Sequence, residues 1–434
     1  MAHITIDCTT EIGRIKPMHA VNNGPIYARS DQTRGNFDLY KAAGIPFARN
    51  HDASFCASYG GEHSVDISAV FPNFDADPID PASYDFAMTD EYLRTILDAG
   101  TQIFYRLGSK IEHGIKKYGT LPPKDFNKWA VVCEHIIRHF NEGFADGHHW
   151  NIEYWEIWNE PDLDPDDSTN KRCWGGTAKH FYELFTITAR HLKACFPDLK
   201  IGGPALAHNT GAWLDGFLDA LTAGETPVPL DFFSWHIYST DPWKVMDKAN
   251  VVREKLDRVG YTETESILNE WNYVENWNTK FIHSIEMIIG IRGAAFTTAC
   301  MCEGQNGNID MMMYYDARPS AFNGLFEYYT FRPLKGYYPF VMFNDLYTLG
   351  TQVKSESDDR DIHVVSAKNN ENSAAMICYY TPDENAKEKT VMINATGTFD
   401  LYTFDDSHDY TKTGSITLPA AITMKPDSVI MLKK

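Results

Sequence analysis

The chain has 434 residues, 43% of them hydrophobic, which is enough to bury the core of one large barrel and a smaller companion domain. Its 59 acidic and 39 basic residues give a formal net charge of −20. A field of this sign repels nucleic acid and anionic membranes, so neither is expected as a partner. It also weighs mildly against a uronate substrate, unless local basic residues outweigh it.

Eight cysteines are scattered without the spacing of a disulfide framework or a metal site. We interpret them as reduced packing residues, which favours a cytoplasmic location. The residues from Met1 to Asp7 lack a basic region followed by an apolar run, so no signal peptide is expected; a secreted or periplasmic protein whose signal had been removed would look the same. The most apolar long stretch, 284–302, contains Glu286 and Arg292 and indicates a soluble helix.

Residues 3–7 and 12–15 predict edge strands ahead of the main domain. Eight short strand candidates then alternate with helix-type sequence, at 17–22, 44–49, 101–107, 152–158, 199–203, 231–237, 265–270 and 309–315. Helical spacing of apolar residues is clearest at 126–140 and 181–195. Eight such alternations predict an α/β fold, a closed (β/α)8 barrel over residues 16–345. A doubly wound sheet also alternates, but no Gly-rich phosphate turn follows the first strand.

From about residue 346 the pattern changes to short strands separated by Asp, Asn, Gly and Pro, without intervening helices. The strand candidates are 361–367, 373–380, 389–394, 399–404, 415–418 and 428–432. This pattern predicts an accessory all-β sandwich.

Two of the barrel strand candidates end in an Asn-Glu pair. Asn159 and Glu160 follow an aromatic strand and precede a proline, and Asn269 and Glu270 follow a second short apolar strand. Buried polar groups at a strand end need partners, because an unpaired one costs roughly 1–3 kcal/mol. A single Asn-Glu pair could equally form a salt bridge at the end of its strand, without any catalytic role. Two pairs at the carboxyl ends of barrel strands place two carboxylates in one mouth, which suits glycoside hydrolysis.

These motifs resemble glycoside hydrolase family 39, the β-xylosidases and α-L-iduronidases among the retaining glycosidases. The family's acid/base motif corresponds to Trp158–Leu163 and its nucleophile motif to Leu268–Asn272, with Asn269 where many members have threonine. Further similarity follows in the same order at 202–205, 213–214 and 232–238. The resemblance implies that the N-terminal strands complete the sandwich, giving an accessory domain of residues 1–15 plus 346–434.

The resemblance also implies a double displacement, with Glu160 as acid/base and Glu270 as nucleophile. Retention would place the two carboxyl groups about 5–5.5 Å apart, against roughly 6.5–9.5 Å for inversion. The two roles require one raised and one ordinary pKa, and Trp155 and Trp158 could desolvate Glu160. We expect an exo-acting β-xylosidase-like enzyme. An α-L-iduronidase, an α-L-arabinofuranosidase, an enzyme for longer oligosaccharides and a non-catalytic carbohydrate-binding barrel are the alternatives.

Further substrate-binding residues are expected around the two glutamates. By resemblance, Asn159 holds the 2-hydroxyl, and the strand-end pair His236 and Tyr238 lies in the active site, with Tyr238 donating to Glu270. Arg49 and His51 belong to a polar cluster that also includes Asp52 at the end of the second strand. Arg49 is a candidate to pair with Glu270, and His51 to bind a sugar hydroxyl. Weaker candidates end the first and third strands: Asn22 and Arg106.

The eighth strand departs from the family, since Tyr315 and Asp316 stand where relatives carry a tryptophan and acidic groups. Tyr315 is a candidate sugar platform and Asp316 a hydroxyl ligand. Trp174 is the candidate for an outer subsite, with Trp271 and Trp277 as alternatives. We interpret most of the sixteen histidines as surface or capping groups, so no metal or cofactor is expected. A glycoside or oligosaccharide is the expected partner, and the sequence leaves homo-oligomerisation open.

Overall fold

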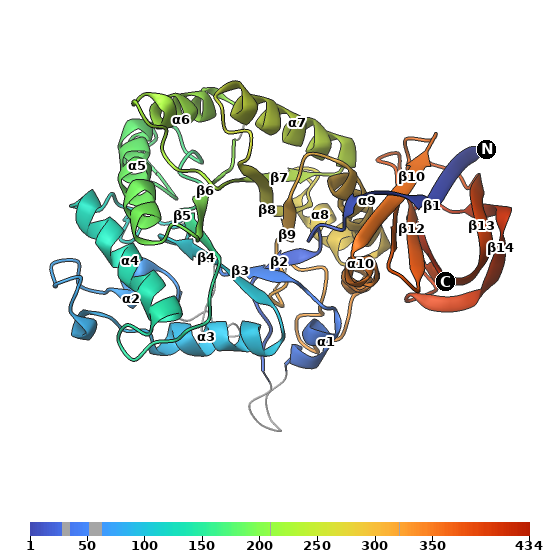
Figure 1. Ribbon diagram of the computed structural model, residues 1–434, viewed down its shortest axis with the longest axis horizontal. Helices are drawn as coiled ribbons and strands as arrows, with labels where there is room; N and C mark the ends of the chain where they lie inside the picture. Colours follow the sequence, from blue (N-terminus) through green and yellow to red (C-terminus); the bar gives the residue numbers. More distant parts are fainter. Residues whose placement is uncertain (28–34, 52–62, 209, 321) are drawn as a thin grey trace.

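The computed structural model describes two domains, a closed parallel barrel and a curled antiparallel sheet at one side of it (Figure 1). Both chain termini lie in the second domain. The residues described are 1–27, 35–51, 63–208, 210–320 and 322–434. Asp52 and Cys56, which entered the sequence interpretation, lie outside the described residues.

Eight parallel strands close the barrel in chain order, and the pairing of β9 with β2 completes the ring. This confirms the predicted fold. The strands are β2 (Ala20–Asn22), β3 (Phe47–Arg49), β4 (Gln102–Leu107), β5 (Tyr154–Ile157), β6 (Lys200–Leu206), β7 (Phe232–Ser239), β8 (Glu265–Tyr273) and β9 (Met311–Tyr314). Three of them, β6, β7 and β8, extend beyond the predicted ends. Their last residues therefore reach into the mouth of the barrel.

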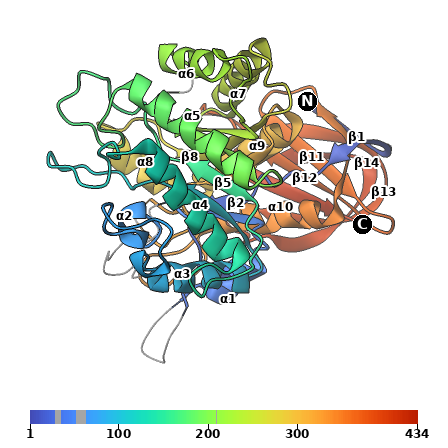
Figure 2. The same ribbon diagram turned by 60° about the vertical axis from the view of Figure 1, so that its left-hand side comes forward.

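Helices cover the outside of the barrel because each buries one apolar face (Figures 1 and 2). In α4, for example, Asp125 caps the first turn by accepting from the Lys128 amide, and Gly143 ends the helix with φ of 81°. The helices are α1 (Phe37–Ala42), α2 (Ile67–Val70), α3 (Ala87–Asp98), α4 (Phe126–Glu142), α5 (Ala178–Cys195), α6 (Ala212–Thr222), α7 (Pro242–Arg258), α8 (Phe281–Ile288), α9 (Ile291–Asn306) and α10 (Tyr338–Leu349), with short 3-10 turns η1 (Pro81–Ser83) and η2 (Lys335–Tyr337).

The amino-terminal end of the barrel is filled by an apolar layer. Its seven members come from six of the strands: Ala20, Phe104, Tyr154, Phe232, Ile267, Met311 and Met313. Their aromatic rings interlock, with the centroids of Phe104 and Phe232 5.1 Å apart. This layer closes that end, so a ligand can enter only from the carboxyl ends of the strands.

The second domain is a seven-stranded sheet in the order β1-β10-β11-β12-β15-β13-β14, which curls so that β1 also pairs with β13. The N-terminal segment is one irregular strand, not two, and β10 was not predicted. The predicted strands 389–394 and 399–404 are one long strand that is only interrupted by a shift of register before Gly397. The strands are β1 (Ala2–Arg14), β10 (Thr351–Ser357), β11 (Ile362–Lys368), β12 (Ser373–Tyr379), β13 (Lys389–Phe404), β14 (Thr411–Met424) and β15 (Ser428–Lys433).

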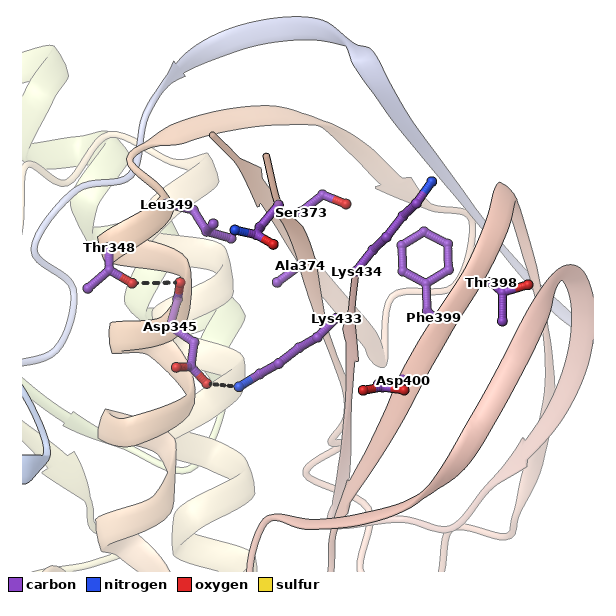
Figure 3. Close-up of a pocket in the computed structure, with 11 residues that line it drawn as sticks. Asp345, Thr348, Leu349, Ser373, Ala374, Thr398, Phe399, Asp400, Lys433 and Lys434 are labelled. Atoms are coloured by element: carbon purple, nitrogen blue, oxygen red, sulfur yellow. Dashed lines mark hydrogen bonds and ion pairs between the residues drawn. The ribbon is translucent and has the colours of Figure 1, made fainter. Parts of the chain in front are cut away.

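Polar contacts join this sheet to the helices of the barrel. Lys433 pairs with Asp345 of α10 at 2.5 Å, beside a cavity of about 530 Å³ between α10 and the sheet (Figure 3). His363 Nδ1 lies 2.7 Å from a carboxylate oxygen of Glu303 on α9. These contacts, with the buried faces of α9 and α10, attach the accessory sheet to one side of the barrel.

The seven described cysteines are all free thiols. Among the described residues, no single helix is both long and apolar enough to cross a membrane; α8 and α9 meet that test only as a pair bent by 78°. In α9, most residues are buried inside the protein.

Candidate active site

A sharp turn at the end of β5 presents Glu160 to the mouth of the barrel. Trp158 and Glu160 both have positive φ, 76° and 47°, which is rare for residues other than glycine. Hydrogen bonds hold this turn: the Trp158 amide donates to the Leu107 carbonyl at 2.8 Å, and the Glu160 amide donates to the Ala205 carbonyl at 2.9 Å. Backbone strain held by neighbouring strands is typical of functional sites.

An irregularity in β8 aims Glu270 at the same point. Trp235 of β7 pairs with Leu268, but the next residue, His236, pairs with Glu270, so Asn269 is one extra residue on β8. Such a bulge redirects the side chains that follow it. As a result Asn269 is wholly buried, whereas the Glu270 carboxylate faces the cavity.

The two glutamates meet around one imidazole. His236 Nδ1 lies 2.9 Å from Glu160 Oε1 and 3.6 Å from Glu270 Oε2. One ligand atom from each of the three residues lies within 4.8 Å of the others, so the two carboxylates are close neighbours. Both are largely shielded from solvent, with 13% and 9% of their side chains exposed. Two carboxylates whose nearest oxygens lie this close are compatible with the short separation of a retaining glycosidase.

Two further groups hold the Glu270 carboxylate. The Tyr238 hydroxyl donates to Oε1 at 2.5 Å, and Arg49 Nη1 lies 3.5 Å from Oε2. Burial and the Glu160 carboxylate nevertheless raise the pKa of Glu270, which is about 7 after the lowering effects of His236, Arg49 and Tyr238. Sequence reasoning assigned the raised pKa to Glu160 and an ordinary pKa to Glu270. For Glu270 the outcome differs, because burial outweighs the groups that favour its ionised form.

His236 is neutral near physiological pH, since burial lowers its pKa to about 4. The imidazole therefore contributes hydrogen bonds to the site but no full positive charge. Arg49 is the cation closest to the pair, and its side chain is fully buried.

Arg49 is fixed by a polar network beneath the cavity that sequence reasoning did not identify. The guanidinium donates to Glu156 Oε2 at 2.7 Å through Nε, to Asn159 Oδ1 at 2.6 Å through Nη2, and to Asn22 Oδ1 at 3.1 Å through Nη1. Glu156 Oε1 also accepts from the Ser234 hydroxyl at 2.6 Å and from the Asn269 amide. Both charges are wholly buried, so each requires the other.

Glu156 could have been noticed in the sequence. It is an acidic residue inside the four-residue strand β5, between Trp155 and Ile157, and a buried carboxylate at such a place needs partners. The network explains why Asn159 presents its amide group to the cavity, because Arg49 already occupies its carbonyl oxygen.

Comparison with known proteins agrees with this geometry. The family profile described as Glycosyl hydrolases family 39 matches residues 64–286, about half of the chain. The chain belongs to glycoside hydrolase family 39. The motifs around Glu160 and Glu270 had indicated this family.

Two curated relatives are named beta-xylosidase. The one from Geobacillus stearothermophilus is 34% identical over 127 residues, 29% of this chain, and the one from Caldicellulosiruptor saccharolyticus is 27% identical over 252 residues, 55% of this chain. The matched segments span 23% and 46% of those proteins, so the chain corresponds to less than half of their length.

Solved structures share the fold over the whole chain. A glucosidase from Croceicoccus marinus has a TM-score of 0.81 at 22% identity and covers 100% of this chain and 98% of its own. A monomeric beta-xylosidase from Caulobacter crescentus CB15 has a TM-score of 0.70 at 15% identity and covers 100% of this chain and 99% of its own.

A cavity of about 670 Å³ opens above the two glutamates of this family 39 chain. Most of the predicted site residues line it: His51, Asn159, Glu160, His236, Tyr238, Glu270 and Tyr315. Arg49 lies beneath the cavity and contacts Glu270 from below. The structure brings these residues together, whereas their roles toward a substrate remain predictions.

Several other predicted positions do not line this cavity. Trp174 is 3% exposed and packs edge-on against Trp158 and Phe181, so the outer subsite assigned to it is not there. Its sequence context, a polar loop, did not show that the ring turns inward onto helix α5. Trp277, one of the alternatives, lines the cavity and is 56% exposed. The other alternative, Trp271, is buried.

Asp316 is also buried away from the cavity. Its Oδ2 lies 3.4 Å from Arg318 Nη2 and 3.3 Å from Asn23 Nδ2, so it is a structural ion-pair partner in this arrangement. Arg106, a weaker candidate, pairs with Asp66 at 2.7 Å and does not line the cavity.

The outer wall of the cavity carries basic residues that the sequence interpretation did not single out. They are His113, Arg172, His208 and Lys248. Arg172 is committed to a close ion pair with Asp164, at 2.7 Å. Lys248, on α7, makes no hydrogen bond or ion pair within the described part of the chain, and burial lowers its pKa. Nothing in its helical context distinguishes it from a solvent-exposed lysine.

The three atoms of Glu160, His236 and Glu270 that lie within 4.8 Å of one another could also ligate a metal ion. However, Arg49 stands 3.5 Å from Glu270, and its charge opposes a cation at that position. The arrangement is better suited to holding a proton between two carboxylates.

Proposed function

We propose that the chain is a retaining glycosidase of β-xylosidase type, in which Glu160 is the acid/base and Glu270 the nucleophile. The observation that carries this proposal is that one oxygen of each carboxylate and one nitrogen of His236 lie within 4.8 Å of one another, in a cavity at the carboxyl end of the barrel. Such a short separation favours direct attack by a carboxylate, because an inverting enzyme needs a wider gap that admits a water molecule.

In the first step Glu270 attacks the anomeric carbon while Glu160 gives its proton to the departing oxygen. The products are a glycosyl ester on Glu270 and the free aglycone. Tyr238 and Arg49 each hold one oxygen of Glu270, which leaves the carboxylate fixed in orientation during attack. Asn159 is placed to donate its amide hydrogen to a sugar hydroxyl beside the nucleophile.

In the second step Glu160, now ionised, takes a proton from water as that water attacks the anomeric carbon of the ester. The ester bond to Glu270 breaks, and the sugar leaves with the configuration it had in the substrate. Glu160 regains the proton that it gave away in the first step. Two inversions at one carbon produce the retained anomer.

The raised pKa of Glu270 means that the free pair shares one proton near neutrality. For two coupled carboxylates, the titration belongs to the pair and not to either residue. The reactive arrangement has the proton on Glu160 and the charge on Glu270, which Tyr238 and Arg49 stabilise. We therefore expect kcat/KM to depend on pH as a bell.

The names of two curated relatives support xylose as the sugar, and an exo-acting enzyme is the simplest form of this activity.

Lys248 favours a second candidate, an acidic sugar such as the iduronate of this family's other activity. It is a partly buried cation in the cavity with no hydrogen bond or ion pair among the described residues. Its charge could offset locally the repulsion that the net charge of −20 exerts on a uronate.

Two measurements test the proposal. NMR of the product formed in the first minutes from an aryl xyloside should show the β-anomer, before mutarotation mixes the signals. If the inverted anomer appears first, Glu270 acts as a base toward water and the double displacement is wrong. Rates on a panel of nitrophenyl glycosides and uronides then decide the sugar. A rate on the uronide that exceeds the xyloside rate, and that falls in Lys248→Met, would select the second candidate.

A further inference from the structure

A cluster of two histidines and an aspartate lies on the outer layer of helices, outside the catalytic cavity. Asp90 comes from α3, His139 from the last turn of α4, and His148 from the segment between α4 and β5. One ligand atom of each lies within 4.8 Å of the others. We propose that Asp90, His139 and His148 bind one divalent transition-metal ion, and that Zn²⁺ is the ion their chemistry fits.

The backbone holds the two histidines in place. The His148 amide donates to the His139 carbonyl at 2.6 Å, and the Gly143 amide donates to the His148 carbonyl at 3.0 Å. Gly147 allows this close return of the chain, because a Cβ there would lie 2.2 Å from the His139 carbonyl oxygen. The site is therefore built before any ion arrives, which reduces the ordering cost of binding.

Aromatic side chains fix the two rings. Phe86 stacks on His139 with ring centroids 3.5 Å apart, and Trp150 stacks on His148 at 4.0 Å. His139 is nearly inaccessible to solvent, whereas Asp90 and His148 keep 25% and 17% of their side chains exposed. An ion could thus enter from the side of Asp90 and His148.

The hydrogen bonds of His139 leave room for a proton or a metal ion between its Nε2 and Asp90. Its Nδ1 lies 2.7 Å from the Phe144 carbonyl oxygen, which can only accept, so Nδ1 carries a hydrogen. In the neutral ring, Nε2 then has a lone pair, yet it faces Asp90 Oδ1 at 2.8 Å, another acceptor. Either a second proton or a metal ion must lie on this side. A ring nitrogen bonded to a backbone carbonyl is also the usual support of a metal-ligating histidine.

His148 also turns a ring nitrogen toward Asp90. Its Nε2 is buried, lies 3.2 Å from Asp90 Oδ2, and makes no hydrogen bond with the described residues. The two imidazole centroids are 5.3 Å apart. Without an ion, His139 must be doubly protonated and positively charged to bond Asp90, a carboxylate that it shares with His148. A single divalent ion instead satisfies all three side chains while both rings stay neutral.

The ligand set decides the kind of ion. Two imidazole nitrogens and one carboxylate oxygen suit Zn²⁺ and its neighbours, whereas Mg²⁺ and Ca²⁺ prefer oxygen alone. Zinc bonds of about 2.0–2.2 Å place tetrahedral ligand atoms roughly 3.3–3.5 Å apart. The separations here, 2.8 and 3.2 Å, need to open by about 0.1–0.7 Å.

A second cluster offers a comparison. Glu134, His191 and Cys195 also lie within 4.8 Å of one another, between α4 and α5. There the guanidinium of Arg138 already bonds Glu134 at 2.8 Å, and its positive charge opposes an ion at that place. His191 is therefore a matched control, a partly exposed histidine beside a carboxylate that should contribute nothing to zinc binding.

The proposal is tested by titrating Zn²⁺ into the chelator-treated full chain by calorimetry near neutral pH, with Asp90→Asn, His148→Gln and His191→Ala alongside. We expect the first two to lose one equivalent of bound zinc or to bind it at least roughly tenfold more weakly, and the control to match the wild type. Zinc should raise the melting temperature of wild type and control but not of the two site variants. Co²⁺ should give visible absorption bands that those variants lack.

The proposal fails if the wild type takes up no zinc. It fails equally if Asp90→Asn and His148→Gln keep wild-type affinity, in which case the cluster is an imidazolium–carboxylate network. Loss of zinc binding only in His191→Ala or only in Glu270→Gln would assign the ion to one of the other two clusters. Circular dichroism of each variant separates loss of the site from loss of the fold, and His148 is exposed enough for both His148→Gln and His148→Ala to be used.

Discussion

The two ends of the barrel use the same strands for opposite purposes. At the amino-terminal end, Phe104, Tyr154 and Phe232 pack into an apolar layer with no charge to satisfy. At the carboxyl end, a few residues further along the same strands, Arg49 and Glu156 are buried as a charged pair. Burial of apolar surface stabilises the first arrangement. The second arrangement costs free energy, because its charges are removed from water and held in the interior.

The difference between the two ends shows why the two glutamates need a network of polar groups beneath them. Glu160 and Glu270 are carried by a strained turn and a bulge, and neither would keep its position without fixed neighbours. Arg49 connects the parts, since it contacts Glu156, Asn159 and Glu270 at once. If this interpretation is right, substitutions at the two ends should separate activity from stability.

The largest effect is expected at the nucleophile. Glu270→Ala should lower kcat/KM by ~10⁴-fold or more on every glycoside, because no glycosyl ester can form. Steady-state rates on two or more aryl glycosides measure this. A 2-fluoro sugar of the right type should label the wild type on the peptide containing Glu270. Label on any other carboxylate would assign the nucleophile elsewhere.

The next largest effect, expected at the acid/base, depends on the leaving group of the substrate. Glu160→Ala should slow glycosides with poor leaving groups by roughly 10²–10⁴-fold, because their oxygen must be protonated as it departs. Dinitrophenyl glycosides, whose leaving group departs as the anion, should lose much less in the first step. Equal losses across a series of leaving groups would remove Glu160 from the acid role.

At the opposite end, Phe232→Ala should lower the free energy of unfolding by about 3–5 kcal/mol through the cavity it leaves. Phe232 is fully buried and none of its contacts reach the cavity, so kcat/KM of the remaining folded enzyme should stay near the wild-type value. Urea unfolding and active-site titration measure the two quantities on one preparation. A large fall in kcat/KM at full folding would mean that the two ends are coupled.

The smallest expected effect is a gain in the free energy of unfolding instead of a loss. The pKa of Glu270 is raised from 4.5 to about 7 in the folded protein, so the folded state retains a proton that the unfolded chain releases between these values. Keeping Glu270 buried therefore costs stability progressively as pH rises from 4.5 to 7, and no such cost exists below 4.5. Glu270→Gln removes the charge and should raise stability near pH 8 by up to ~3 kcal/mol.

Urea unfolding of wild type and Glu270→Gln near pH 4, 6 and 8 checks this, with the gain absent at the lowest value. Asp247→Asn, an exposed acidic side chain on α7, is a suitable control. A gain that is equal at every pH would attribute the effect to packing and not to the buried charge.

Sequence reasoning succeeded where a residue's environment follows from its neighbours along the chain. The alternation of strands and helices predicted all eight barrel strands, and the two Asn-Glu pairs predicted which carboxylates share the mouth. It failed where the environment is set by distant segments. Trp174 was placed in a subsite although its ring turns into the core, and β10 was missed because short polar–apolar alternation also occurs in loops.

What the sequence by itself determined is therefore the fold and the pair Glu160 and Glu270, since periodicity and strand-end motifs are local properties. The sequence also suggested that Arg49 pairs with Glu270, which lies 3.5 Å away. Only the tertiary structure showed that Glu156 holds Arg49 from beneath, and that Asp90 meets His139 and His148. These groups are many residues apart in the chain and close together only after folding. Folding decides which partner each charged group has, what its pKa is and whether it can bind a ligand. The spacing of these residues along the chain does not predict any of these properties.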